Sequence, residues 1–88
     1  MTINAKLAIL TIKNYFLIEG GLLKTRIAEL RKDRKLSQAE LAEIVGVTRQ
    51  TITSIETGKY ISSLPLAIKI AKYFGLKVED VFELEEEE

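Results

Sequence analysis

The apolar residues between Ser37 and Gly58 follow two helical repeats separated by a glycine. The first repeat predicts a helix from Gln38 to about Val45, and the second predicts a helix from Arg49 to Thr57. The side chains expected on the inward faces are Leu41, Ile44 and Val45 in the first helix and Ile52 and Ile55 in the second, with the small Ala42 allowing close approach. The pattern therefore predicts two short helices packed against each other.

Residues with capping side chains mark the ends of both helices. Ser37 is followed three residues later by Glu40, which is the spacing of a capping box. Gly46 is expected to end the first helix, because glycine adopts the left-handed backbone of a helix end without steric cost. Val47 fills the turn, and Thr48 is expected to cap the second helix. The segment thus predicts a rigid elbow.

The outward face of the second helix carries only short or planar hydrogen-bonding side chains. This face consists of Thr48, Arg49, Gln50, Thr53 and Ser54. Arginine can donate two hydrogen bonds to guanine, a carboxamide can bond adenine in the same way, and a threonine methyl can contact the thymine methyl. The face suits base reading, although a polar face is also typical of any solvated helix.

Eight residues of the same segment form a motif that is defined by their types and spacings. It comprises Gln38, Ala42, Gly46, Val47, Thr48, Ile52, Glu56 and Gly58. At these spacings the sequence resembles the lambda-repressor-like helix-turn-helix family, which includes the Cro and CI type phage repressors. The resemblance extends from roughly Leu23 to Leu84. It implies a mainly α DNA-binding domain of four to five helices, in which the second helix of the elbow is the recognition helix.

The resemblance also implies roles for individual residues. Arg49, Gln50 and Ser54 would be the principal base readers, and Gln38 would bond a phosphate and brace Arg49. The residues expected beside DNA phosphates are Lys35, Ser37, Gln38, Lys59 and Tyr60. A phosphate near Lys35 and Ser37 would also lie at the positive end of a helix. Arg31 and Glu56 occupy the positions at which family members pair an arginine with a glutamate.

Further helices are predicted on both sides of the elbow. Leu23, Ile27 and Leu30 repeat at intervals of four and three, which predicts a helix from about Leu22 to Arg34. Ser63 is expected to cap another helix, with Pro65 in its first turn and Gly75 at its end. The apolar stripe of this helix comprises Leu64, Ala67, Ile68, Ile70, Ala71 and Phe74.

A short fifth helix from about Val78 to Phe82 is implied by the family, although Lys77 is a poor cap for it. The apolar residues at this end of the chain are Val78, Val81, Phe82 and Leu84. They exceed what a small core can absorb, so we expect some of them at a dimer contact.

Residues 1–21 lie outside the resemblance and allow more than one interpretation. Ile3, Leu7 and Leu10 have helical spacing, but residues 7–12 also alternate as a strand would and are rich in β-branched side chains. We favour a β-hairpin in which Lys6–Ile12 pairs with Tyr15–Ile18 around a two-residue turn. Because an isolated hairpin is marginal in water, this arm is expected to pack against its copy in a second subunit.

Two rival interpretations concern the same residues. Lys6 precedes apolar residues as in a signal peptide, but Lys13 and Asn14 interrupt the run and no small-residue cleavage site follows. The apolar run is also far shorter than the roughly 20 residues that span a bilayer. Alternatively the segment is a translated leader and the working protein starts near Leu22 or Leu23. We expect a cytoplasmic protein that has no membrane partner.

Composition excludes several chemistries. The chain has 88 residues, of which 47% are hydrophobic, enough for one small domain with a modest core. It contains neither cysteine nor histidine, so disulfides, thiol nucleophiles and the commonest general base and metal ligand are excluded. We therefore predict no enzyme activity, no metal site and no cofactor.

Charge is unevenly distributed. The formal net charge is zero, yet 13 basic and 8 acidic residues precede Glu83, and the remaining 5 acids, Glu83 and Glu85 to Glu88, are at the end of the chain. A body with an excess of 5 positive charges favours a polyanionic partner. We interpret residues 85–88 as a solvated acidic tail, with competition against phosphate for the basic face as the alternative.

The sequence thus predicts an N-terminal extension, 1–21, a helix-turn-helix domain, 22–84, and an acidic tail, 85–88. The predicted function is a repressor-like transcriptional regulator that binds double-stranded DNA at a near-palindromic operator. It would bind as a homodimer with each recognition helix in a major groove. The alternative is an antitoxin or other protein-interaction module that autoregulates its operon and binds a toxin through residues 1–21.

Overall fold

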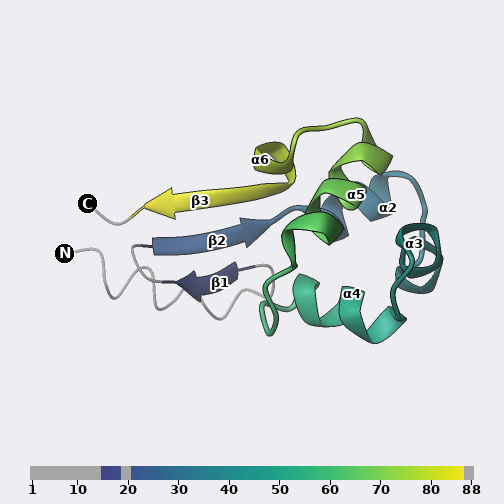
Figure 1. Cartoon of the computed structure of the whole chain (residues 1–88), viewed down its shortest axis with the longest axis horizontal. Coiled ribbons are helices and arrows are strands. Elements are labelled where there is room, and N and C mark those ends of the chain that lie inside the picture. The colour runs from purple at the N-terminus through teal and green to yellow at the C-terminus, as the bar shows by residue number, and fades with distance from the viewer. Residues whose placement is uncertain (1–14, 19–20, 87–88) are drawn as a thin grey trace.

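The fold is seen in a computed structural model that describes residues 15–18 and 21–86. A group of short helices is joined to an antiparallel sheet that extends to one side of it (Figure 1). The elements are β1 (Tyr15–Ile18), β2 (Gly21–Thr25), α2 (Ile27–Asp33), α3 (Gln38–Val45), α4 (Arg49–Glu56), α5 (Leu64–Phe74), α6 (Val78–Val81) and β3 (Phe82–Glu86). The predicted class, a mainly α domain with a short N-terminal β-hairpin, is confirmed.

The middle strand of the sheet, β2, corrects the predicted start of the first helix. Residues 21–25 pair with β1 on one edge and with β3 on the other, with Leu23 opposite Phe16 and Leu84. The helix begins only at Ile27, whose N–H donates to Thr25 Oγ1 at 3.2 Å. A helix through Leu23 was wrong because strand partners far along the chain satisfy this backbone, which no local periodicity reveals.

The predicted hairpin is confirmed in one of its strands only. Tyr15–Ile18 is a strand, as expected, but its described partner is Gly21–Thr25. The other expected strand, Lys6–Ile12, lies outside the described residues.

The end of the chain departs from the predicted helix and tail. Helix α6 ends at Val81, and Phe82 begins strand β3, which continues through Glu85 and Glu86. Val81 is fully buried in the core, whereas Leu84 is 51% exposed. Lys77 does not cap α6 with its side chain, but its backbone N–H donates to Asp80 Oδ2 at 3.3 Å. Glu85 and Glu86 were expected in the solvated tail. They belong instead to β3, which lies at one edge of the described three-stranded sheet.

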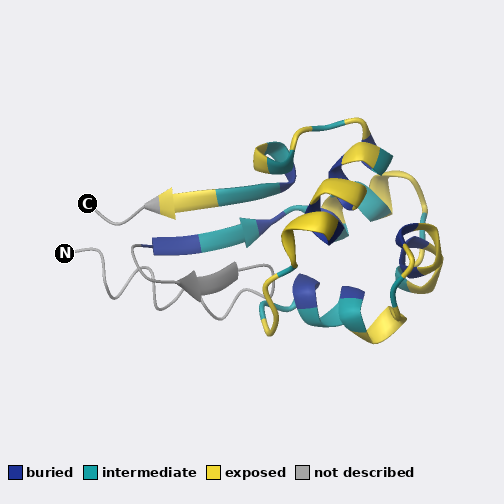
Figure 2. Cartoon of the chain, viewed as in Figure 1, coloured by how far each residue is buried: buried dark blue, intermediate teal, exposed yellow. Residues whose placement is uncertain are grey.

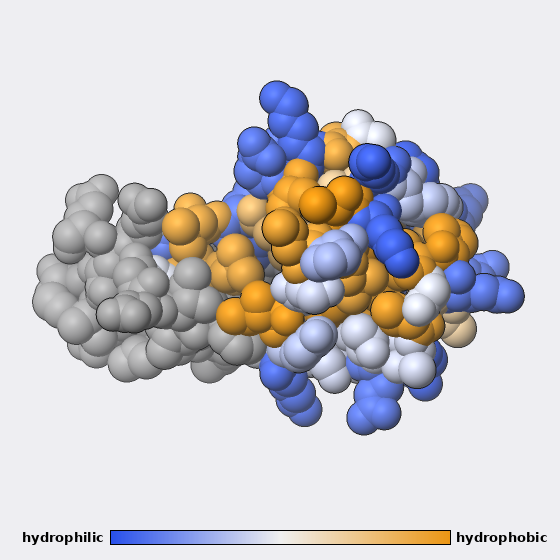
Figure 3. Space-filling model, viewed as in Figure 1, coloured by the Kyte–Doolittle hydropathy of each residue, from blue (hydrophilic) through white to orange (hydrophobic). Residues whose placement is uncertain are grey.

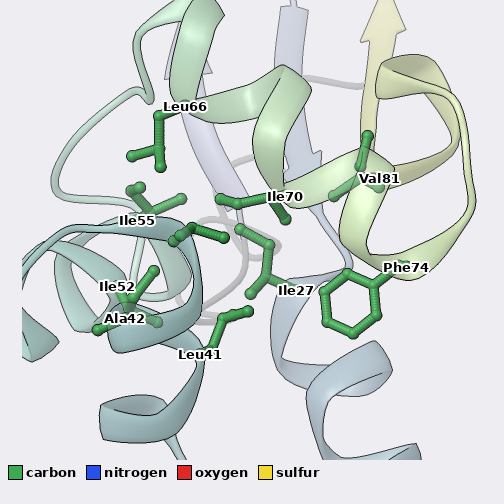
Figure 4. Packing of buried hydrophobic residues seen from close by; sticks show 11 residues of the cluster. Ile27, Leu41, Ala42, Ile52, Ile55, Leu66, Ile70, Phe74 and Val81 are labelled. Carbon is green, nitrogen blue, oxygen red and sulfur yellow. The ribbon is translucent and has the colours of Figure 1, made fainter.

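The core lies between α2, α3, α4, α5 and α6 (Figure 4). Its fully buried side chains include Ile27, Leu41, Ile52, Ile70 and Val81. Ile44, Leu64 and Ile68 were predicted to face inward, but they are 48%, 66% and 38% exposed. Of the α3 residues predicted to pack inward, Leu41, Ala42 and Val45 are buried, and only Ile44 faces outward. In α5 the buried residues are Leu66, Ala67, Ile70, Ala71 and Phe74.

Candidate nucleic-acid interface

Two reciprocal hydrogen bonds start helix α3. The Glu40 backbone N–H donates to Ser37 Oγ at 3.0 Å, and the Ser37 backbone N–H donates to Glu40 Oε1 at 2.8 Å, which confirms the predicted capping box. The hydrogen bond from the Ser37 backbone lowers the pKa of the Glu40 carboxyl below its ordinary value. The start of the elbow is therefore fixed by its own backbone groups.

The turn between α3 and α4 has the predicted geometry. Gly46 adopts a left-handed backbone with φ of 80°, and its N–H and that of Val47 both donate to the Ala42 carbonyl. Thr48 Oγ1 then accepts a hydrogen bond from the Thr51 backbone N–H at 3.2 Å. Because the turn and the cap together define where α4 begins, they also define the direction in which its first residues point.

The predicted reading face of α4 is accessible. Thr48, Arg49 and Gln50 are exposed and Thr53 and Ser54 are half-buried, while Ile52 and Ile55 are buried on the opposite side. In Figure 2 the first turn of α4 is yellow and the helix becomes more buried toward its end. A shallow hollow on this face is lined by Thr48, Gln50, Thr51, Ser54 and Tyr60. All five predicted base readers can therefore be approached from outside.

A buried ion pair anchors the other end of α4. Arg31 Nε and Nη2 on α2 donate to Glu56 Oε2 and Oε1 at 2.8 and 3.1 Å, and Arg31 Nη1 donates to the Leu36 carbonyl at 3.0 Å. The two side chains are 11% and 6% exposed. This geometry bears out the pairing that the family resemblance implied, and it uses the planar fork of arginine in the way that favours a carboxylate partner.

Gln38 joins the ion pair to the reading face. Its Nε2 donates to Glu56 Oε1 at 2.9 Å, and its Oε1 accepts from Thr53 Oγ1 at 3.0 Å. The resemblance implied that Gln38 braces Arg49, whereas the structure shows the brace at Thr53, one turn further along α4. Sequence reasoning missed this link, because no local spacing connects a residue on α3 with a particular hydroxyl on α4.

The residues predicted at DNA phosphates lie on both sides of α4 along the chain. Lys35 and Ser37 are exposed in the connection from α2 to α3, and Lys59 and Tyr60 are exposed directly after α4. Gln38 is half-buried at the first position of α3. Lys35 has a left-handed backbone with φ of 55°, which is uncommon for a residue with a side chain. Basic and hydroxyl groups thus precede and follow α4.

A capped two-helix elbow with an accessible polar outer face defines a helix-turn-helix DNA-binding domain. The family model for helix-turn-helix proteins matches residues 27–81. The chain therefore belongs to the helix-turn-helix family of transcriptional regulators, which are DNA-binding proteins and not enzymes.

Relatives agree with this assignment. Over 65 residues the chain is 55% identical to the regulator YgzD of Bacillus subtilis, covering 74% of this chain and 98% of that protein. Among solved structures it is similar to the restriction-modification controller protein C.AhdI of Aeromonas hydrophila, with 31% identity, a TM-score of 0.58, and coverage of 62% and 83% of the two chains. It is also similar to a chain of the SinR protein/SinI protein complex, with 30% identity, a TM-score of 0.58, and coverage of 62% and 54%.

Within the described part of the chain, no helix is both long and apolar enough to cross a membrane.

Proposed function

We propose that this regulator binds a near-palindromic operator as a homodimer and places α4 of each subunit in a major groove. The observation that carries the proposal is the difference between the two ends of α4. Arg49 and Gln50 in its first turn are exposed, whereas Glu56 at its last position is buried in the ion pair with Arg31. A helix held at its far end and open at its start matches the way in which recognition helices read base edges with their N-terminal residues.

Base reading would be divided among the five side chains of the outer face. Arg49 suits guanine, because a guanidinium can donate to O6 and N7 together, and Gln50 suits adenine. The Ser54 carbonyl accepts from the Lys59 backbone N–H, but its hydroxyl makes no hydrogen bond within the described part of the chain and is free to donate to or accept from a base. Thr48 uses its hydroxyl oxygen as the helix cap, so its methyl is the more suitable reading group.

Phosphate contacts would come from Lys35, Ser37, Gln38, Lys59 and Tyr60. Two of these retain a donor despite their internal hydrogen bonds. Ser37 Oγ accepts from the Glu40 backbone, which leaves the hydroxyl proton for a phosphate oxygen. Gln38 uses an amide N–H on Glu56, and a side-chain amide has a second one. Such contacts would position α4 in the groove without selecting a sequence.

Exposed apolar surface supports the dimer. Ile61 and Leu64 are 44% and 66% exposed, and they border a groove that is also lined by Leu23, Ala67, Val78 and Phe82. Apolar side chains gather over the start of α5 and the adjoining part of the sheet (Figure 3). Some of the residues expected at a dimer contact, Val78 and Phe82, therefore lie in this groove.

Selection of bound duplexes from a random library tests this function. The proposal requires enriched sequences with two inverted half-sites whose centres are about 10 base pairs apart, or roughly 34 Å. Enrichment of a single half-site would show DNA reading without the proposed dimer. Recovery of duplexes with no shared sequence would overturn the function.

A second function is favoured by one comparison, the similarity to a chain of the SinR protein/SinI protein complex. In this alternative the chain binds another protein through residues 1–21. An example is an antitoxin that also represses its own operon. Co-purification of a partner with the full chain and its loss on deletion of residues 1–21 would support it. Retention of the same partner by the shortened chain would exclude that role for the segment.

A further inference from the structure

A chain of hydrogen bonds runs from the protein interior to the reading face of α4. Arg31 on α2 donates to Glu56, Gln38 on α3 donates to Glu56 Oε1 at 2.9 Å, and Thr53 Oγ1 on α4 lies 3.0 Å from Gln38 Oε1. Thr53 Oγ1 also lies 3.1 Å from the backbone carbonyl oxygen of Arg49. The side chain of Thr53 is half-buried, between this network and the outside.

The donor and the acceptor of each hydrogen bond in this network follow from the chemistry of the side chains. A guanidinium only donates hydrogen bonds, so the ionised Glu56 carboxylate accepts from Arg31 and can only accept from Gln38 as well. Gln38 must therefore turn its NH₂ group toward Glu56 and its carbonyl oxygen toward Thr53. That oxygen cannot donate, so the Thr53 hydroxyl must be the donor.

The hydroxyl of Thr53 consequently has no proton left for DNA. A hydroxyl carries one proton, and both of its neighbours here, Gln38 Oε1 and the Arg49 carbonyl, are acceptors. The methyl group leaves Cβ in a different direction and takes no part in these bonds. Thr53 therefore differs from Ser54, whose hydroxyl makes no hydrogen bond within the described residues.

We propose that Thr53 reads DNA through its methyl group and selects the 5-methyl of a thymine, with Gln38 and the ion pair turning its hydroxyl away from the groove. Thymine is the base whose major-groove edge carries a methyl group, so an apolar reader distinguishes it from the others. This inference rests on the proposed function, since it assumes that α4 enters the major groove.

The test uses the full chain and a duplex recovered by the selection described above. Each thymine of a half-site is replaced in turn by deoxyuridine, which removes only the 5-methyl group. At the position that Thr53 reads, the wild-type protein should lose about fourfold in affinity, the usual effect of burying one carbon group less. A position read by the Thr48 methyl can show a second loss, which Thr53→Ser should leave in place. Thr53→Val, which keeps a methyl, should show the same thymine preference, whereas Thr53→Ser, which keeps the hydroxyl, should bind the two duplexes equally.

Thr57→Ser is the matched control, because it removes a methyl at the C-cap of the same helix, at a residue that does not line the reading face and whose hydroxyl donates to the Thr53 carbonyl. It should leave the thymine preference unchanged. The inference is overturned if no thymine replacement weakens the wild-type protein, if Thr53→Ser keeps the thymine preference at every position where the wild type has one, or if Thr53→Val loses a preference that the wild type has while its melting temperature shows a folded protein. Failure of the proposed function is a separate result, in which the library yields no preferred duplex at all.

Discussion

Arg31 and Glu56 form a two-bonded ion pair, with N···O distances of 2.8 and 3.1 Å, between the first described helix, α2, and the end of α4. Glu56 is only 6% exposed, so the loss of Arg31 would leave a carboxylate in a largely dry site with Gln38 as its remaining side-chain partner. The pair therefore helps to hold α4 in place, and its contribution to the free energy of unfolding depends on both partners being present.

The first prediction concerns this pair. Arg31→Met should lower the free energy of unfolding by about 3–5 kcal/mol, because it leaves a buried charge unpaired. Arg31→Met combined with Glu56→Leu should cost less than the single change, because both buried charges are then removed. Urea denaturation of the wild type and the two variants measures this difference. A double variant less stable than Arg31→Met would contradict the buried pairing.

A second prediction separates folding from DNA binding at Lys35. Glycine adopts the left-handed backbone of this residue without the steric cost of a side chain, so Lys35→Gly should raise the free energy of unfolding by roughly 0.5–1 kcal/mol. The same change should weaken binding to all duplexes, because a cation beside the phosphates is lost. Lys69→Ala, which removes an exposed charge from α5, is the control and should affect binding less. Equal losses of DNA affinity for Lys35→Gly and Lys69→Ala would show that Lys35 does not contact a phosphate.

Gly46 provides a third prediction, because its backbone has a φ of 80° and a Cβ added there would meet no atom within 4 Å. The cost of Gly46→Ala is therefore only the backbone strain, about 1–2 kcal/mol. Thermal unfolding should show this loss, while DNA affinity measured well below the melting temperature should be retained. A loss of affinity in the folded variant would mean that the turn has changed its geometry.

The pH dependence of stability gives a fourth prediction. The pKa of Glu40 is lowered in the folded state by the hydrogen bond from the Ser37 backbone. The stabilisation is therefore fully present above the ordinary pKa of 4.5, and it is lost as pH falls through the lower pKa of the folded state. Glu40→Gln should melt below the wild type at neutral pH, and the difference should shrink below pH ~4. A difference in melting temperature that is independent of pH would argue against the charged cap.

The elbow could be predicted from the sequence because its signals are local. Ser37 and Glu40 are three residues apart, Gly46 and Thr48 lie within one turn, and each acts on backbone groups of its nearest neighbours. The ion pair of Arg31 and Glu56 is not local, and only the family resemblance suggested it. The outward positions of α4, proposed as the reading residues, followed from the elbow, because the buried positions of a helix determine which positions remain outside.

The sheet could not be predicted in the same way. Leu22 and Leu23 are good helix formers, and the strand β2 is decided by pairing with β3, some 60 residues later in the chain. The acidic residues Glu83 and Glu85 have low strand preference, so composition pointed away from β3. The outward orientation of Ile44 and Leu64 likewise depends on how the helices pack and not on their own spacing.

The central claim, that α4 reads base pairs while flanking cations hold the backbone, is tested most directly by comparing Arg49→Ala with Lys59→Ala. Affinity for the selected duplex and for a random duplex is measured for each variant at one salt concentration. Arg49→Ala should cost about 1–3 kcal/mol on the selected duplex alone and relax the preference at one base pair, whereas Lys59→Ala should weaken both duplexes equally. Equal losses on both duplexes for both variants would contradict the account.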